Sequence, residues 1–290
     1  MLPAAPTPAP VATQVPARSD PCGGPQELLK KYLSASPCVF VAGQIAVQVT
    51  YSGTSVPEVL TNSANGKTTT ISSHAFGYPG ALLHIGVSPT SQITIVMPSF
   101  SQISSTQNGM VAGTDDMEFR YKQLVYSNPK GGVLAGVLAT YQAPTGSPAL
   151  TAAAPSYEVT PLLNIALNKA RSIGENLSFP VTNAPSGEPG GPRTWSFAPQ
   201  AVTLWRSPGG TLLAIVAQYG FSSNRLYLTL NTAQLVSRNF QIQGTYGGNN
   251  APVDYVNPVE DVPHAVGTAY SRSFTVGFSY LMGYSEAPAR

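Results

Sequence analysis

The sequence predicts an all-β protein, a transmembrane antiparallel β-barrel of about twelve strands with a short N-terminal helix. Three observations support this prediction: side chains that alternate in polarity, a low content of charge, and connections of unequal length. The alternation is clearest in "SRSFTVGFSYLMG" at residues 271–283, where every second residue is apolar. Successive side chains of a strand point to opposite faces. The apolar face therefore contacts either a protein core or lipid.

The low charge favours lipid. Only 10% of the residues are charged, against about 25% in typical soluble domains. The longest apolar runs, at residues 133–139 and 212–217, are far shorter than the roughly 18 residues of a spanning helix, so no transmembrane helix is expected. The net charge is +2 and the densest basic pair is Lys30-Lys31, which argues against a nucleic-acid partner.

The connections between the predicted strands are short after even-numbered strands and mostly long after odd-numbered ones. This asymmetry, with an even number of strands, is typical of an outer-membrane barrel whose two termini lie in the periplasm. Four prolines fall inside the predicted strands, where we expect bulges or frayed pairing near the long-loop end: Pro98, Pro161, Pro180 and Pro199. The predicted strands are 39–52, 79–88, 91–101, 114–127, 131–143, 155–170, 175–182, 194–206, 211–219, 225–236, 240–247 and 268–282.

Charged residues alternate along one predicted strand, "DDMEFRYKQLVY". Arg or Lys facing hydrocarbon costs about 2–4 kcal/mol near the midplane, so this face is predicted to line the lumen and to tune selectivity. A solvated face of a soluble sheet would show the same alternation. The predicted lumen residues are Asp116, Glu118, Arg120, Lys122 and, on a neighbouring strand, Glu158.

Three segments are predicted: residues 1–38, a Pro/Ala-rich leader and a short helix near 26–33, periplasmic or plug-like; residues 39–283, the barrel; and residues 284–290, a C-terminal tail. Residues 1–19 lack the pattern of a signal peptide. Cys22 and Cys38 are predicted to form a disulfide around the helix, which implies an oxidising compartment; two free thiols are the alternative.

No catalytic or metal-ligand set emerges from the sequence. His74, His84 and His264 are far apart and have no metal-ligand spacing. No nucleophile elbow, phosphate-binding loop or dinucleotide fingerprint is present. We therefore expect neither an enzyme nor a cofactor.

Several stretches together resemble the outer-membrane transporter-like proteins of the meta-pathway phenol-degradation family: "DPCGGPQELL…SPC", "GQIAVQVTY", "IGVSPTSQITIVMPSF", "GTDDMEFRYKQLVY" and "ATYQAPTGS". The resemblance covers residues 20–282. It implies a barrel in the outer membrane of a Gram-negative proteobacterium that takes up hydrophobic or aromatic compounds. The last strand also resembles the signal that the barrel-assembly machinery reads, with Thr275, Gly277, Tyr280 and Met282 at the matching places, although "GYSEAPAR" continues past it.

The leading hypothesis is thus an outer-membrane channel or transporter for small apolar or amphipathic solutes, surrounded by outer-membrane lipid. The first alternative is a soluble or surface β-sandwich that binds a ligand or partner. An outer-membrane lipid hydrolase is the third, disfavoured by the missing nucleophile and base.

Overall fold

The structure is a computed structural model. It describes residue 22 and residues 28–61, 68–105, 109–128, 132–148, 150–151, 154–168, 173–185, 192–207, 209–221, 225–237, 239–256 and 263–282. The leader at residues 1–19 and the tail at residues 284–290 lie outside the described residues.

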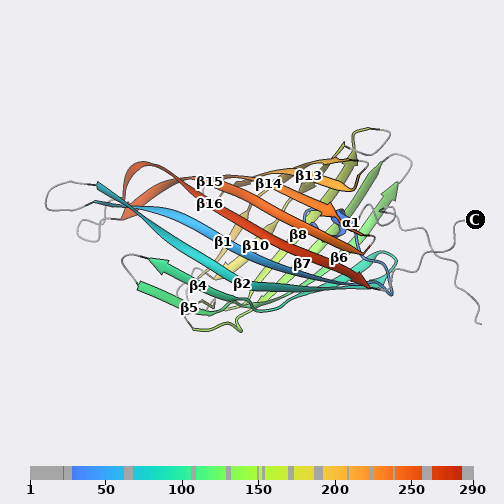
Figure 1. The fold of residues 1–290 in the computed structure, drawn as a ribbon, viewed down its shortest axis with the longest axis horizontal. Helices are drawn as coiled ribbons and strands as arrows, with labels where there is room; N and C mark the ends of the chain where they lie inside the picture. Colours follow the sequence, from blue (N-terminus) through green and yellow to red (C-terminus); the bar gives the residue numbers. More distant parts are fainter. Residues whose placement is uncertain are drawn as a thin grey trace, which may run out of the picture.

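One antiparallel sheet closes on itself to form the barrel (Figure 1). The circuit is closed because β1 pairs with both β16 and β2. It contains twelve strands, since the segment pairs β3 with β4, β5 with β6, β9 with β10 and β11 with β12 each form one barrel strand. This confirms the predicted fold class. The helix is α1 (Leu28–Tyr32), and the strand segments are β1 (Ile45–Thr61), β2 (Thr68–Ser88), β3 (Ser91–Val96), β4 (Phe100–Ser105), β5 (Gly109–Thr114), β6 (Met117–Asn128), β7 (Val133–Ala143), β8 (Ser156–Ala166), β9 (Ile173–Ser178), β10 (Val181–Pro185), β11 (Arg193–Phe197), β12 (Gln200–Arg206), β13 (Thr211–Gly220), β14 (Arg225–Leu235), β15 (Phe240–Val256) and β16 (Pro263–Met282).

Three of the four strand prolines divide a barrel strand into two segments. Pro98 separates β3 from β4, Pro180 separates β9 from β10, and Pro199 separates β11 from β12. The register continues across each break, since Leu82 pairs with Val96 before Pro98 and Tyr78 pairs with Phe100 after it. A proline lacks the N–H that the ladder requires. The prolines therefore interrupt hydrogen bonding without changing which strands are neighbours.

Pro161 differs from the other three, because it remains within β8, opposite Val137 of β7. Its carbonyl accepts a hydrogen bond from the backbone N–H of Phe179 at 3.1 Å. The carbonyls of Pro180 and Pro199 accept bonds from the next strands in the same way, at 3.2 and 3.0 Å. Each of these three prolines therefore keeps one backbone hydrogen bond to the next strand, as an acceptor.

Two of the predicted long loops are mostly strand. Residues 53–61 and 68–78 pair as extensions of β1 and β2, and residues 248–256 and 263–267 pair as extensions of β15 and β16. These two extended hairpins reach far beyond the other strands (Figure 1). These stretches are rich in Thr, Ser, Gly and Asn and show no apolar alternation. Periodicity reports a buried face, so it misses strands whose pairing rests on backbone hydrogen bonds alone.

The exterior of the barrel is apolar. In β16 the outward residues Phe274, Val276 and Phe278 are 48%, 55% and 42% exposed, while Ser279 and Leu281, which point inward, are almost fully buried. Exposed apolar side chains along every strand suit a hydrocarbon environment. A sandwich would bury this face between two sheets, so the closed barrel excludes the β-sandwich alternative.

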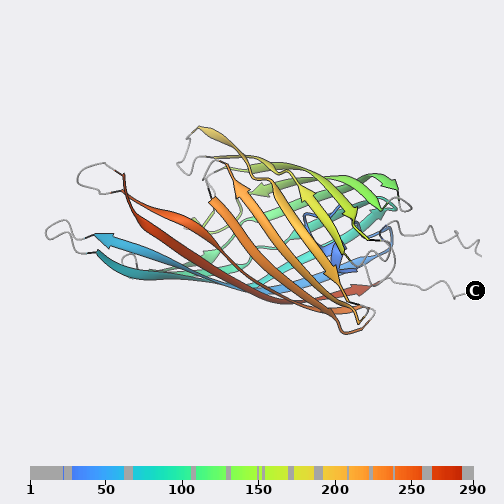
Figure 2. The same ribbon diagram turned by 90° about the horizontal axis from the view of Figure 1, so that it is seen from above.

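The two ends of the barrel differ. The short connections, α1 and the C-terminal end of β16 lie at one end, called here the terminus end, and the extended hairpins lie at the other, called the hairpin end (Figure 2). No helix within the described ranges is long and apolar enough to cross a membrane.

Candidate functional site

The interior of the barrel at the terminus end is occupied by the chain's own N-terminal segment, residues 28–44, called here the plug (Figure 2). The plug precedes β1, which begins at Ile45 rather than at the predicted Val39. Val39 and Phe40 are fully buried. The disulfide between Cys22 and Cys38 is present, with the two Cα atoms 5.7 Å apart, and ties the two ends of the loop that contains α1.

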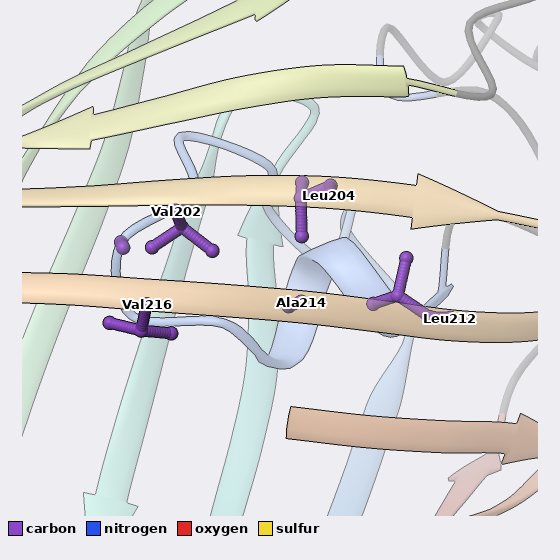
Figure 3. Packing of buried hydrophobic residues seen from close by; sticks show 6 residues of the cluster. Val202, Leu204, Leu212, Ala214 and Val216 are labelled. Atoms are coloured by element: carbon purple, nitrogen blue, oxygen red, sulfur yellow. The ribbon is translucent and has the colours of Figure 1, made fainter. Parts of the chain in front are cut away.

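One side of the plug packs on an apolar part of the wall. Ala35 contacts inward side chains of β12 and β13, with Leu33 and Ala233 beside them. Figure 3 shows these wall side chains in front of the plug ribbon. These inward apolar residues therefore contact the plug. The wall residues of this cluster are Val202, Leu204, Leu212, Ala214 and Val216.

A second contact joins three rings. The Tyr32 and Phe40 ring centroids are 5.1 Å apart, and each lies within 5.4 Å of the His84 ring of β2. His84 Nδ1 lies 2.9 Å from Thr94 Oγ1 and Nε2 lies 3.3 Å from Gln48 Oε1. These bonds fix the imidazole plane against which the plug rings pack. His84 is thus a wall residue in contact with the plug.

Two inward glycines make room for the plug. A Cβ added to Gly86 would lie 1.9 Å from the backbone oxygen of Val41, and one added to Gly136 would lie 3.1 Å from Cβ of Pro37. A side chain at Gly86 requires the plug backbone to move. The plug therefore fits beside Gly86 only because that position carries no side chain, whereas a Cβ at Gly136 would first meet the backbone oxygen of Gln123 in the neighbouring strand, at 2.7 Å.

Lys122 of β6 binds the plug directly. Its Nζ donates to the carbonyl oxygens of Leu33 at 2.9 Å and Cys38 at 3.3 Å, at the two ends of the turn that follows α1. On the adjacent strand β3, Gln92 Oε1 accepts a hydrogen bond from the backbone N–H of Phe40 at 2.8 Å. A buried ammonium requires such partners. Of the predicted lumen residues, Lys122 is the one the structure places against the plug.

The other predicted lumen residues have separate surroundings. Glu118 and Arg120 of β6 form an ion pair. Glu158 of β8 lies at the level of Arg120, with Thr140 between them, and accepts hydrogen bonds from Thr160 at 2.8 Å and Thr182 at 3.0 Å.

Asp116 precedes β6 and binds the connection that follows β7. Its Oδ1 accepts bonds from the Gly146 N–H at 2.8 Å and the Thr151 hydroxyl at 2.5 Å. Asp116 is buried at the start of the row of charges along β6, where it binds this connection and, through Oδ2, accepts from Gln142 Nε2 of β7 at 3.5 Å. No group of three His, Cys, Asp or Glu side chains within the described residues could hold a metal ion.

The last strand β16 carries the four residues predicted as an assembly signal. Tyr280 and Met282 point outward and are 48% and 42% exposed, and Thr275 and Gly277 point inward. A Cβ on Gly277 would lie 2.5 Å from the Val49 backbone oxygen of β1. Gly277 thus permits the close approach of the two strands that close the barrel.

The comparisons with known proteins agree with the fold. No family model matches the sequence, and no curated protein matches it. The structure is similar to the COG4313 outer membrane channel from Pseudomonas putida F1, with a TM-score of 0.60 and 13% identity over 84% of this chain and 97% of that one. The NanC porin has a TM-score of 0.48 with 6% identity over 81% and 98% of the two chains. The TodX monoaromatic hydrocarbon channel has 0.46 with 8% identity over 91% and 94%.

Identity this low shows the fold alone, and at TM-scores below 0.5 the porin and the hydrocarbon channel add nothing to it. The chain has the fold of a bacterial outer-membrane β-barrel. The narrower resemblance to the meta-pathway phenol-degradation family rests on the sequence motifs and enters only the proposal below.

Proposed function

We propose that this protein is an outer-membrane channel for small hydrophobic or aromatic molecules, and that its plug closes the bore at the terminus end. The observation that carries the proposal is the pairing of a lipid-compatible exterior with a plug built into the interior. Such a plug obstructs the bore, and its displacement would open a conduit through the barrel. Plugged barrels that transport solutes are a known variation of this architecture.

The side chains on the two sides of the bore favour the proposal that the solute is apolar or amphipathic. On β12 and β13 the inward Val, Leu and Ala side chains lie under the plug, with Gln200 and Gln218 farther along the same strands, and on β6 and β8 the inward side chains include Glu118, Arg120 and Glu158. A solute that passes when the plug is displaced meets both the hydrocarbon wall that the plug had covered and the charged wall. Aromatic molecules present both a hydrophobic surface and a polarised edge and face, and the sequence resemblance points to the same class.

The charged residues of the hairpin-end half are assigned to selectivity. Glu118, Arg120 and Glu158 set the field along the bore, since lumen substitutions tune selectivity. Asp116 shapes the rim through its loop, and Lys122 holds the plug. Thr275, Gly277, Tyr280 and Met282 are proposed to be read by the barrel-assembly machinery.

The lipid hydrolase is not favoured. One histidine–hydroxyl pair of the described residues, His84 with Thr94, is buried under Phe40, with 3% and 2% of the two residues exposed. A lipid ester has no access to it while the plug is in place.

Uptake by intact cells tests the proposal. Gram-negative host cells that express the protein should accumulate a radiolabelled aromatic solute faster than cells with an empty vector. Outer-membrane fractionation and a gel shift between unheated and boiled samples verify that the barrel is folded and inserted. Equal uptake despite a folded, inserted barrel contradicts the channel, and clean extraction without detergent contradicts the membrane location.

A further inference from the structure

A cavity of about 140 Å³ lies between the end of α1 and the wall formed by β1, β13, β14 and β15. Tyr32 and Leu33 of the plug form one side of it. The inward side chains of the wall around it are Gln48, Leu212, Asn231, Ala233, Gln241, Gln243 and Thr245. The cavity is thus lined by several carboxamides, one phenol ring and a few aliphatic groups.

Two of these carboxamides have an oxygen without a partner. Gln241 is 1% exposed, and its Nε2 donates to Gln243 Oε1 at 3.0 Å. Its Oε1, like Oδ1 of Asn231 on the neighbouring strand, has no hydrogen-bond partner among the described residues. A buried acceptor that lacks a donor costs about 1–3 kcal/mol. Both oxygens belong to residues that line the cavity but have almost no accessible surface of their own, so a molecule in the cavity supplies the missing donors when either carboxamide turns toward it.

We infer that this cavity is a binding site for a small neutral molecule that carries a hydroxyl group on an apolar body. The site rests on the proposed function, as a stop for solute beside the plug. A hydroxyl both donates and accepts, and it satisfies a carboxamide in either of its two orientations. The Tyr32 ring, Leu33 and Leu212 contact the apolar body.

Charge and size narrow the class of molecule further. No carboxylate, ammonium, guanidinium or imidazole group is among the described residues that line the cavity. An ion placed there loses its hydration without a counter-charge. An engineered protein cavity of about 150 Å³ holds one benzene molecule, so a volume of about 140 Å³ accommodates one six-membered ring.

Calorimetric titration of the full-length protein in detergent micelles tests the site. Three probes share one ring: cyclohexanol, which has the hydroxyl; methoxycyclohexane, which lacks the donor; and cyclohexylammonium, which is charged. Titration of protein-free micelles gives the heat of partitioning, which is subtracted. Cyclohexanol should bind saturably, at least tenfold more tightly than either of the other two.

Matched variants locate the binding. Gln241→Leu removes the unpartnered oxygen and should weaken cyclohexanol binding about tenfold. Asn231→Leu, on a different strand, should do the same and replaces the first variant if that barrel does not fold. Gln218→Leu changes a glutamine of β13 that does not line the cavity and should leave the affinity unchanged.

Three results would overturn the site: equal affinity for all three probes, wild-type affinity in the folded Gln241 or Asn231 variant, or no saturable heat with cyclohexanol, which means that the cavity holds water only. The uptake experiment separates this inference from the proposed function. Uptake of the aromatic solute without cyclohexanol binding would reject the binding site and keep the proposed channel. Cyclohexanol binding without uptake would reject the channel and keep the binding site.

Discussion

Strands β6 and β13 present the same kind of outer face and opposite inner faces. Outward, Phe119 on β6 and Ile215 on β13 are 40% and 54% exposed. Inward, β6 carries Glu118, Arg120 and Lys122, while β13 carries Leu212, Ala214 and Val216. The outer face is apolar all around the barrel, which suits the single lipid environment that we propose for it. The residue types of the inner face differ from strand to strand, because they depend on whether the plug or another wall side chain lies opposite.

The largest expected effect is on the face the two strands share. Phe119→Arg and Ile215→Arg should each destabilise the inserted barrel, by about 2–4 kcal/mol near the midplane, because each places a guanidinium in hydrocarbon. The free energy of unfolding in urea, measured in lipid vesicles, gives the value. If Phe119→Arg inserts normally, the outward assignment of this residue is wrong.

The next effect concerns the loop that holds the plug. The double variant Cys22→Ser, Cys38→Ser removes a cross-link that encloses 15 residues, worth about 3 kcal/mol in the chain-entropy model. If that energy supports docking, the undocked fraction of the plug rises roughly hundredfold. Single-channel recording should show longer open periods, and a reductant should reproduce them in the wild type. Unchanged openings in both cases would show that the disulfide does not restrain the plug.

A smaller effect is expected from the charged contact of β6. Lys122→Met keeps the length of the side chain and removes both hydrogen bonds to the plug carbonyls. Such bonds contribute about 1.5–3 kcal/mol, offset in part because a buried ammonium is no longer desolvated. A net loss of about 1 kcal/mol raises the open probability roughly fivefold. Lys122→Arg, which retains the donors, is the control, and equal open probability in the Met variant and the wild type would remove the role assigned to Lys122.

The smallest expected effect is on the ion selectivity of the bore, independent of whether the plug closes it. Arg120→Ala leaves Glu118 without its ion-pair partner, so the bore becomes more negative and should favour cations by roughly twofold, with the barrel still folded. The reversal potential in a salt gradient measures this ratio, and Arg120→Lys should restore it. A reversal potential that does not move shows that Arg120 is remote from the path.

Much of this contrast could be predicted from the sequence, and for one reason. Outward side chains are apolar on every strand, so the alternation along strands such as β16 predicts which residues point outward. The short connections predict the number of strands. The cysteine pair was predicted from its spacing. The extensions of β1 with β2 and of β15 with β16 were missed because their sequences show no regular apolar alternation.

The plug contacts could not be predicted, because they depend on which residues meet after the barrel closes. Phe40 is 44 residues from His84 in the sequence, yet their rings lie 5.4 Å apart. Inward apolar residues such as Leu204 have the same appearance whether a solute or the chain itself lies opposite. One signal was available: Gly86 and Gly136 stand at inward positions of otherwise regular strands, where a missing side chain marks a close approach of backbone.

The conductance of a single barrel in a planar lipid bilayer tests the central claim, that the plug closes a channel. The full-length protein is compared with a variant lacking residues 1–41, and both are first shown to be folded by their shift on unheated gels. The full-length protein should give small, mostly closed currents, and the truncated barrel should give a larger and steadily open conductance. Equal conductance from two folded barrels would contradict the account, because the bore would then be open with the plug in place or closed without it.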